Sequence, residues 1–220
     1  MNVREKLAKL KTKIPSEVLL VAVSKTKPAP LIIEAYNEGH RDFGENKVQE
    51  LVLKQEKLPK DIKWHFIGHL QTNKVKHIAS FIHLIHAVDS IKLLKEINKQ
   101  AVKNNRTINV LIQFHIAKEI SKYGIAPNQA IQFFDEVNTL NLLNVKILGV
   151  MGMATYTTNQ SQIRNEFKLL KNTFDTIKNY SYKNISEFKE ISMGMSGDYA
   201  LAIEQGSTIV RIGSSIFGNI

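Results

Sequence analysis

Cysteine is absent from the 220-residue sequence, so neither a disulfide bond nor a thiolate metal site can form. No apolar run approaches the roughly 20 residues that a membrane-spanning helix needs. Residues 1–7 are dense in charge and lack the apolar core of a signal peptide. No Gly-x-Gly-x-x-Gly motif follows the first apolar segment, which disfavours an open dinucleotide-binding sheet. These absences predict a cytoplasmic protein with no membrane partner.

Positive charge exceeds negative charge in this chain. Thirty Lys and Arg residues against twenty Asp and Glu give a net charge of +10 and a pI of about 9.6, so nucleic-acid binding has to be considered. The basic residues are spread along the chain, however, and do not alternate with aromatic residues as in a base-stacking platform. No helix-turn-helix or zinc module is recognisable. We therefore expect a solvated lysine-rich surface rather than a nucleic-acid interface.

Strand-like and helix-like segments alternate along the whole chain. Strands are predicted at 18–24, 41–45, 63–68, 84–89, 109–116, 146–153, 190–193 and 208–212. Helices are predicted at 30–40, 47–57, 72–80, 90–104, 127–140, 159–179 and 198–205, after an amphipathic helix near the N-terminus. Eight alternations without a low-complexity linker predict an α/β protein, a closed (β/α)8 TIM barrel with an extra N-terminal helix, as one domain over residues 1–220.

Lys25 follows the first apolar strand directly. Residues 18–24 form a continuous β-branched and aliphatic run up to Ser24, which is typical of a strand buried on both faces in a parallel sheet. An ammonium held against apolar walls at the carboxyl end of such a strand loses its proton more readily and becomes an amine nucleophile. TIM barrels place their chemistry at these strand ends. Lys25 is therefore predicted to form a Schiff base with a carbonyl compound.

Two loops rich in glycine and serine follow the last two predicted strands. The loop at 192–198 contains Ser196, and the turn after the last strand contains Gly213 and Ser214. Loops after strands seven and eight of such barrels frequently bind phosphate, because small residues let the backbone approach the ligand and a helix start presents free N–H groups. Arg211 lies near the end of the last strand, where alternate side chains point into the barrel. We expect Arg211 to contact the ligand rather than to form a surface salt bridge.

A Schiff-base lysine and a phosphate site that face one cavity suit a compound with both an aldehyde and a phosphate. Pyridoxal 5′-phosphate (PLP) is the common compound of this kind. The chain also resembles the pyridoxal phosphate homeostasis proteins, single-domain relatives of the N-terminal barrel of alanine racemase. The stretches that carry the resemblance are 20–27, 43–50, 64–74, 121–124 and 192–218.

The resemblance implies a set of cofactor-binding residues, which are Lys25, Asn46, Ser196, Arg211, Gly213 and Ser214. The lysine would carry the cofactor as an aldimine, and the two serines and the glycine would hold its phosphate. The arginine would lie near the pyridine nitrogen, and the asparagine near the ring. One departure is visible in the fifth strand, where Phe114 and His115 replace the usual Val and Asn of the family. We expect His115 to be a tolerated barrel residue rather than a change to the pocket edge.

The implied position of Arg211 limits the chemistry. A cation near the pyridine nitrogen disfavours its protonation, which makes the ring a weak electron sink. Racemisation also needs two acid/base groups on opposite faces of the cofactor, and related racemases take the second from a tyrosine of a second domain that we do not expect in a sequence ending at Ile220. We therefore expect a monomeric PLP carrier that buffers the cofactor or delivers it to PLP-dependent apo-enzymes, without robust catalytic activity. The alternatives are a PLP-dependent amino-acid racemase or related enzyme, and a cofactor-free Schiff-base aldolase.

A metal site is not expected from the histidines. His65 and His69 straddle a strand end and a glycine, so their i, i+4 spacing does not put them on one helical face. His83 and His86 flank the fourth strand, and no carboxylate cluster accompanies them in the sequence. Asp198, at the start of a predicted helix, is expected to act as a cap or a local hydrogen-bond partner.

Overall fold

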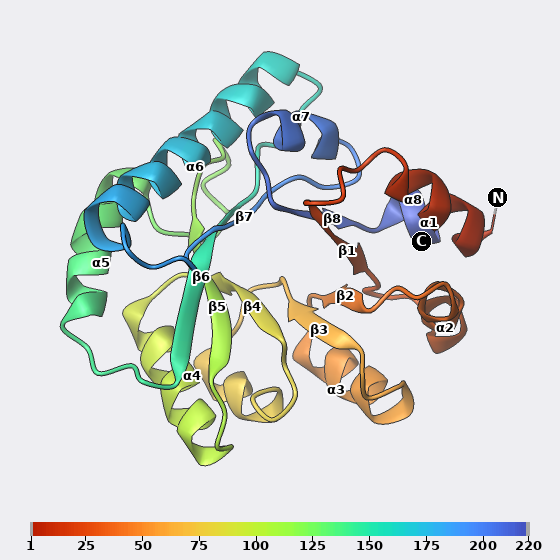
Figure 1. Ribbon diagram of the computed structural model, residues 1–220, viewed down its shortest axis with the longest axis horizontal. Coiled ribbons are helices and arrows are strands. Elements are labelled where there is room, and N and C mark those ends of the chain that lie inside the picture. The colour runs from red at the N-terminus through yellow and green to blue at the C-terminus, as the bar shows by residue number, and fades with distance from the viewer. Residues whose placement is uncertain (1, 219–220) are drawn as a thin grey trace.

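The computed structural model describes residues 2–218 and shows a closed barrel of parallel strands surrounded by helices (Figure 1). Each strand pairs with the next along the chain, and β1 also pairs with β8, which closes the barrel. The strands are β1 (Leu19–Val23), β2 (Asp42–Glu45), β3 (Lys63–Phe66), β4 (Leu84–Val88), β5 (Ile108–Phe114), β6 (Val145–Gly152), β7 (Glu190–Ser192) and β8 (Ile209–Ile212). The predicted (β/α)8 barrel is confirmed.

The helices follow the strands in the predicted order and cover the outside of the barrel. The α-helices are α1 (Val3–Lys11), α2 (Ala29–Asn37), α3 (Val48–Lys57), α4 (Ile91–Lys103), α5 (Ala130–Asn138), α6 (Gln160–Ser181), α7 (Tyr199–Glu204) and α8 (Ser214–Phe217). Helix α1 is the expected additional N-terminal helix, although Met1 itself lies outside the described residues. Two short 3-10 helices, η1 (Thr72–His77) and η2 (Pro127–Gln129), complete the set.

The two 3-10 helices correct the sequence prediction in detail. The segment at 72–80 was expected to be a helix of ordinary type, but it forms η1. Val75 and Ile78 are fully buried and three residues apart, which is the spacing at which side chains align on a 3-10 helix. The helix expected from residue 127 begins with η2, and its α-helical part starts only at Ala130.

The core lies mainly between the barrel wall and the helices. Four of the five residues of β1 are buried, as its unbroken apolar run predicted, and all five residues of β4 are buried as well, including His86. Each helix buries one stripe of side chains, and in α4 the stripe includes Leu93, Leu94 and Ile97. A smaller apolar cluster, which includes Val21, Leu111 and Met151, is separate from that core.

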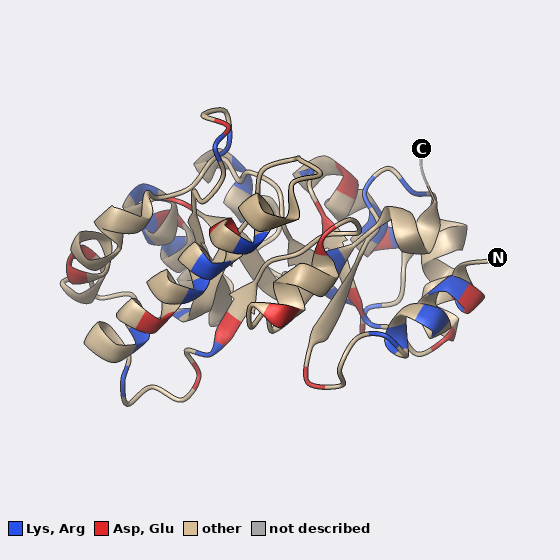
Figure 2. Cartoon of the chain, turned by 90° about the horizontal axis from the view of Figure 1, so that it is seen from above, with Lys and Arg blue, Asp and Glu red and all other residues tan. Residues whose placement is uncertain are grey.

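The described part of the chain contains no helix that is long and apolar enough to cross a membrane. Lys and Arg, and Asp and Glu, are found along many of the helices and loops in Figure 2. Whether this surface binds nucleic acid is not decided by the distribution of charge, and the solvated lysine-rich surface stays a prediction.

Candidate functional site

A cavity of about 540 Å³ opens at the carboxyl ends of the strands. Its walls contain all six residues that the sequence analysis selected, namely Lys25, Asn46, Ser196, Arg211, Gly213 and Ser214. These residues come from both ends of the chain and meet because the strands of a parallel barrel all end at the same edge. The structure therefore brings the predicted site residues together at one cavity.

Lys25 lies two residues beyond the end of β1, at the mouth of this cavity. Its neighbours on both sides are held by α3, because the Lys54 ammonium donates to the Ser24 carbonyl at 2.7 Å and the Thr26 N–H donates to Glu50 at 2.5 Å. Thr26 has a φ of 62°, an uncommon left-handed conformation for a residue with a branched side chain. Residues 24–26, the lysine loop, therefore have a backbone held by hydrogen bonds to α3, but the Lys25 side chain itself is exposed. The expectation that apolar walls enclose its ammonium is wrong, because the side chain is exposed.

Behind the lysine loop lies a buried network built on Glu45. One carboxylate oxygen, Oε1, accepts hydrogen bonds from the Ser24 hydroxyl at 2.5 Å and from the Lys54 ammonium at 2.8 Å. The other oxygen, Oε2, is buried and has no partner in residues 2–218. Burial raises the pKa of Glu45, and the hydrogen bonds from Lys54 and Ser24 oppose that rise. Lys54 is the single cation in direct contact with this carboxylate among the described residues.

The two glycine- and serine-rich loops contact each other across the cavity rim. The Ser196 hydroxyl accepts a hydrogen bond from the Gly213 N–H at 3.2 Å. A Cβ on Gly213 would lie 3.1 Å from the carbonyl oxygen of Val23, so a larger residue would press on β1. Hydrogen bonding within α8 begins at Ile216, which leaves the N–H of Ser214 without an acceptor in the described chain. The rim therefore offers a hydroxyl and a free N–H group close together.

Asp198 stabilises the first of these loops. Its carboxylate accepts a hydrogen bond from the Met195 N–H at 2.6 Å, which confirms the predicted local hydrogen-bonding role. Burial raises the pKa of Asp198, while the hydrogen bond from Met195 opposes the rise. Gly194 within this loop has a φ of 93°, and a Cβ there would lie 2.6 Å from the Cβ of Ala202. Only glycine fits at this position.

Arg211 points into the barrel as the position in β8 predicted. The side chain is only 3% exposed, and its guanidinium donates to the Ser192 hydroxyl at 2.6 Å and to the Gly152 carbonyl at 3.1 Å. Burial lowers the pKa of Arg211 to about 10, and the charge of Asp198 opposes that change. The guanidinium therefore remains a cation at neutral pH and forms one wall of the cavity. The structure excludes the alternative of a surface salt bridge.

Asn46 reaches the cavity from the end of β2. Its side-chain oxygen is buried and has no partner within residues 2–218, and a buried polar atom without a partner is a group that a ligand can satisfy. The backbone of Asn46 packs against Gly68, where a Cβ would lie 2.3 Å from the Asn46 carbonyl oxygen. His115 is not part of the cavity wall; its ring nitrogen contacts the Glu119 carbonyl at 2.9 Å. His115 directly follows the end of β5, and its tolerance at this position stays a prediction.

The sequence analysis missed part of the cavity wall. The missed side chains include Met153, Thr155, Tyr156 and Thr157, which follow β6, and Ile67, which follows β3. A usable signal existed, because these residues also lie just beyond the carboxyl ends of predicted strands. They carry no distinctive motif, and the sequence does not indicate which of the strand-end loops turn inward.

A group of histidines with one carboxylate lies at the amino-terminal end of the strands, opposite the cavity. Ligand atoms of Asp42, His65 and His83 lie within 4.8 Å of one another. No carboxylate cluster accompanies these histidines in the local sequence, but the pairing of β2 with β3 and of β3 with β4 brings the single carboxylate of Asp42 close to His65 and His83. The Asp42 carboxylate already contacts Nε2 of His65 at 3.1 Å.

The chain is similar to several characterised proteins over nearly its whole length. Residues 1–220 match the family described as "Alanine racemase, N-terminal domain". The pyridoxal phosphate homeostasis protein of Aquifex aeolicus is 44% identical over 200 residues, which cover 90% of this chain and 86% of that protein.

Solved structures give the same result. PipY of Synechococcus elongatus, solved without PLP, superposes with a TM-score of 0.92 at 32% identity, covering 99% of this chain and 100% of PipY. The structure of PipY with PLP bound gives a TM-score of 0.89 at 33% identity, again over 99% of this chain and 100% of PipY. The chain therefore belongs to the family of pyridoxal phosphate homeostasis proteins, whose barrel is that of the alanine racemase N-terminal domain.

Proposed function

We propose that the protein binds PLP in the cavity at the carboxyl ends of the strands and serves intracellular PLP homeostasis by holding the cofactor and releasing it to other proteins. The observation that carries this proposal is the position of Lys25, Arg211 and the two loops at 192–198 and 213–214 around one cavity of about 540 Å³. The related PipY, whose structure with PLP bound superposes on nearly the whole chain, supports it.

The residues of the cavity fit the functional groups of PLP. When bound, PLP supplies an aldehyde that condenses with an amine and releases water. Lys25 is the lysine of the cavity wall, and its exposed position at the mouth gives the aldehyde access to its amine. The Ser196 hydroxyl and the N–H of Ser214 offer donors to the phosphate. The unpartnered oxygen of Asn46 is available to a polar substituent of the ring.

Arg211 gives this site its chemical character. The guanidinium is buried, remains charged at neutral pH and is already held by Ser192 and the Gly152 carbonyl. Placed beside the pyridine nitrogen, it keeps that nitrogen unprotonated, and the ring then stabilises carbanions poorly. Such a site suits retention of PLP better than the transformation of amino acids. An amino-acid racemase or related PLP enzyme is the alternative, and loss of the α-proton signal of free amino acids in D₂O, followed by NMR, would support it.

The proposal is tested by the visible spectrum and by borohydride trapping. Purified protein is incubated with PLP, reduced with borohydride, digested and mapped by mass spectrometry. We expect a yellow protein whose reduced adduct maps to Lys25 and is absent from Lys25→Ala. Lys27→Ala is the matched control, because Lys27 lies two residues away and donates to the carbonyl of Gly218; this variant is expected to keep the adduct. A colourless protein that takes up no PLP would contradict the proposal and favour a cofactor-free Schiff-base aldolase.

The proposed role also includes release to recipients, for which PLP-dependent apo-enzymes are the expected class. Lys25 lies at an open mouth and not in a closed chamber, which supports access by a recipient. Transfer to an apo-enzyme that is faster than release of PLP to a small-molecule trap would establish direct delivery. We further propose that the protein acts as a monomer in the cytoplasm, which sedimentation and cell fractionation test.

A further inference from the structure

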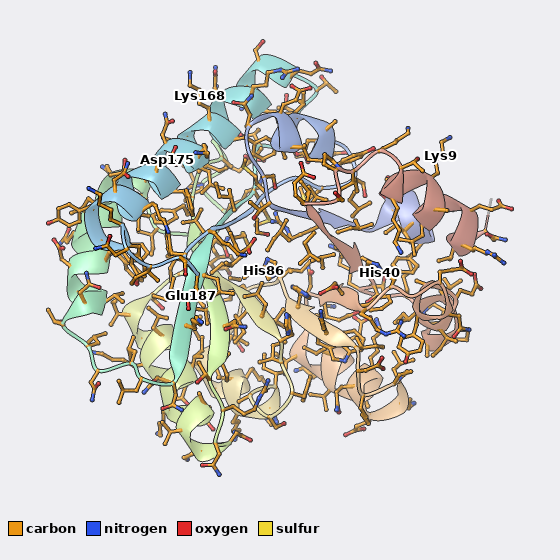
Figure 3. All side chains as sticks on the ribbon, viewed as in Figure 1. Lys9, His40, His86, Lys168, Asp175 and Glu187 are labelled. Atoms are coloured by element: carbon orange, nitrogen blue, oxygen red, sulfur yellow. The ribbon has the colours of Figure 1, made fainter. Side chains whose placement is uncertain are left out.

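A continuous chain of hydrogen bonds crosses the interior of the barrel and ends on Arg211. The Arg211 guanidinium contacts the Ser192 hydroxyl at 2.6 Å, and that hydroxyl contacts Nδ1 of His86 at 2.9 Å. Nε2 of His86 contacts Nδ1 of His65 at 2.9 Å, and Nε2 of His65 contacts the Asp42 carboxylate at 3.1 Å. His86 lies near the middle of the barrel in Figure 3. The chain thus links the cavity at one end of the barrel to a carboxylate at the other.

This hydrogen-bond chain lies in the interior of the barrel, and every ring nitrogen of its two histidines has a partner. His65, His86 and Ser192 are fully buried, while the Asp42 side chain at the far end is 14% exposed. Both nitrogens of each imidazole have a partner within the chain. In a low-dielectric interior such a fully connected polar network is held rigidly, because an unpaired member would carry a desolvation penalty.

The chemistry of the two ends limits the directions that these hydrogen bonds can take. A guanidinium only donates, and a carboxylate only accepts. Burial, together with the charge of the Arg211 guanidinium, holds the pKa of His86 well below its ordinary value, so this imidazole is neutral and has one N–H. Burial raises the pKa of Asp42, but the hydrogen bond from His65 opposes that rise and the pKa lies below its ordinary value, so the far end is an anion.

Two arrangements of the protons are then possible. In the first, Ser192 donates to His86, His86 donates from Nε2 to His65, and His65 donates from Nε2 to Asp42. In the second, His86 donates from Nδ1 to Ser192, so that His65 presents either a bare nitrogen or an imidazolium to Asp42. Only the first satisfies every group with both imidazoles neutral, because a bare nitrogen facing a carboxylate is repulsive.

We infer that His65, His86 and Ser192 are positioning residues that hold Arg211 for the PLP ring through a one-directional hydrogen-bond chain ending on Asp42. This inference rests on the proposed function for its ligand. The Ser192 hydrogen is directed toward His86, which leaves an oxygen lone pair for the Arg211 N–H. Asp42 therefore contributes to the cavity from the opposite end of the barrel, without touching the ligand.

The first test reads the tautomers in the ligand-free protein. ¹⁵N-histidine NMR at pH 7 is expected to show both His65 and His86 protonated on Nε2 and bare on Nδ1. Asp42→Ala removes the acceptor and is expected to abolish the fixed tautomer of His65, while Asp42→Asn retains an acceptor oxygen and should keep it. An Nδ1-protonated His86 or an imidazolium His65 in the wild type would overturn the inference.

The second test reads the ligand. Asp42→Ala is expected to weaken PLP binding by about 3- to 10-fold, the effect of one altered hydrogen bond, and to shift the absorption band of bound PLP. Asp61→Ala is the matched control, since the Asp61 carboxylate is exposed and pairs with Arg41, which is not part of the hydrogen-bond chain. This variant should leave PLP binding and the absorption band unchanged. Unchanged binding and spectrum in a folded Asp42→Ala protein would refute the positioning role. Failure of the wild type to bind PLP would refute the proposed function, whereas the NMR result still decides whether the chain has this direction.

Discussion

Replacement of Lys54 by methionine tests how the lysine loop is built. Lys54 is buried, and its ammonium contacts the Ser24 carbonyl at 2.7 Å, Glu45 at 2.8 Å and Glu50 at 2.6 Å. Lys54→Met keeps most of the side-chain volume but removes the only cation that touches Glu45 in the described chain. Glu45 then keeps a single hydrogen bond, from the Ser24 hydroxyl.

The expected loss is large because the partner left behind is buried. Breaking a buried ion pair by removing one member costs about 3 to 5 kcal/mol, since the remaining charge is uncompensated. The burial that already raises the pKa of Glu45 acts unopposed by Lys54 in the variant, so Glu45 takes up a proton at a higher pH than in the wild type. The stability deficit of Lys54→Met is therefore expected to be greater at pH 7 than at pH 5.

Urea unfolding at pH 7 and pH 5 measures this effect. Lys57→Met is the matched control, because Lys57 lies on the same helix but is exposed, and its change should stay within about 0.5 kcal/mol. The double variant Glu45→Gln with Lys54→Met should recover much of the lost stability, because no buried charge remains. A loss below about 1 kcal/mol for Lys54→Met, equal at both pH values, would refute the reasoning.

Two further predictions concern pH and the cavity wall. Burial lowers the pKa values of His40 and His83 to about 4; the unfolded chain therefore binds protons first, and stability present above about pH 6.5 is lost as the pH falls toward 4. For His40 the loss of stability amounts to about 3 kcal/mol. The urea midpoint of the wild type should therefore fall between pH 7 and pH 5, and the midpoint of His40→Gln should fall less. A wild-type midpoint that does not change with pH would contradict this prediction. Gly68→Ala places a Cβ 2.3 Å from the Asn46 carbonyl oxygen. We expect the free energy of unfolding to fall by about 1 to 3 kcal/mol and PLP binding to weaken. Unchanged PLP binding in a folded protein would show that Asn46 does not contribute to binding.

Much of the site was predictable because a barrel turns sequence order into spatial order. The alternation of apolar runs and amphipathic segments predicted every strand, and the strands of a parallel barrel end at one edge. Lys25 after β1 and Arg211 in β8 were therefore expected at the same mouth, and the family resemblance added Asn46 after β2. The cavity wall confirms their proximity, while their individual roles toward PLP stay predictions.

Other features depended on packing that the sequence does not encode locally. Lys25 is exposed although the strand before it is buried, and the periodicity of the sequence does not report the exposure of a loop residue. Thr155, Tyr156 and Thr157 face the cavity only because the loop after β6 turns inward. Lys54 looks like an ordinary helix lysine in the sequence, and its burial against Glu45 appears only when α3 packs on the strands.

The sequence by itself determined the fold class, the family and the edge of the barrel where the site lies, because these depend on local periodicity and on motifs of neighbouring residues. The tertiary structure alone decided that Asp42, His65, His86 and Ser192 form one chain to Arg211. These residues lie on five different strands, and Ser192 is 106 residues from His86. Side chains that far apart meet only when the sheet closes on itself, since closure turns the alternate residues of every strand toward one shared interior.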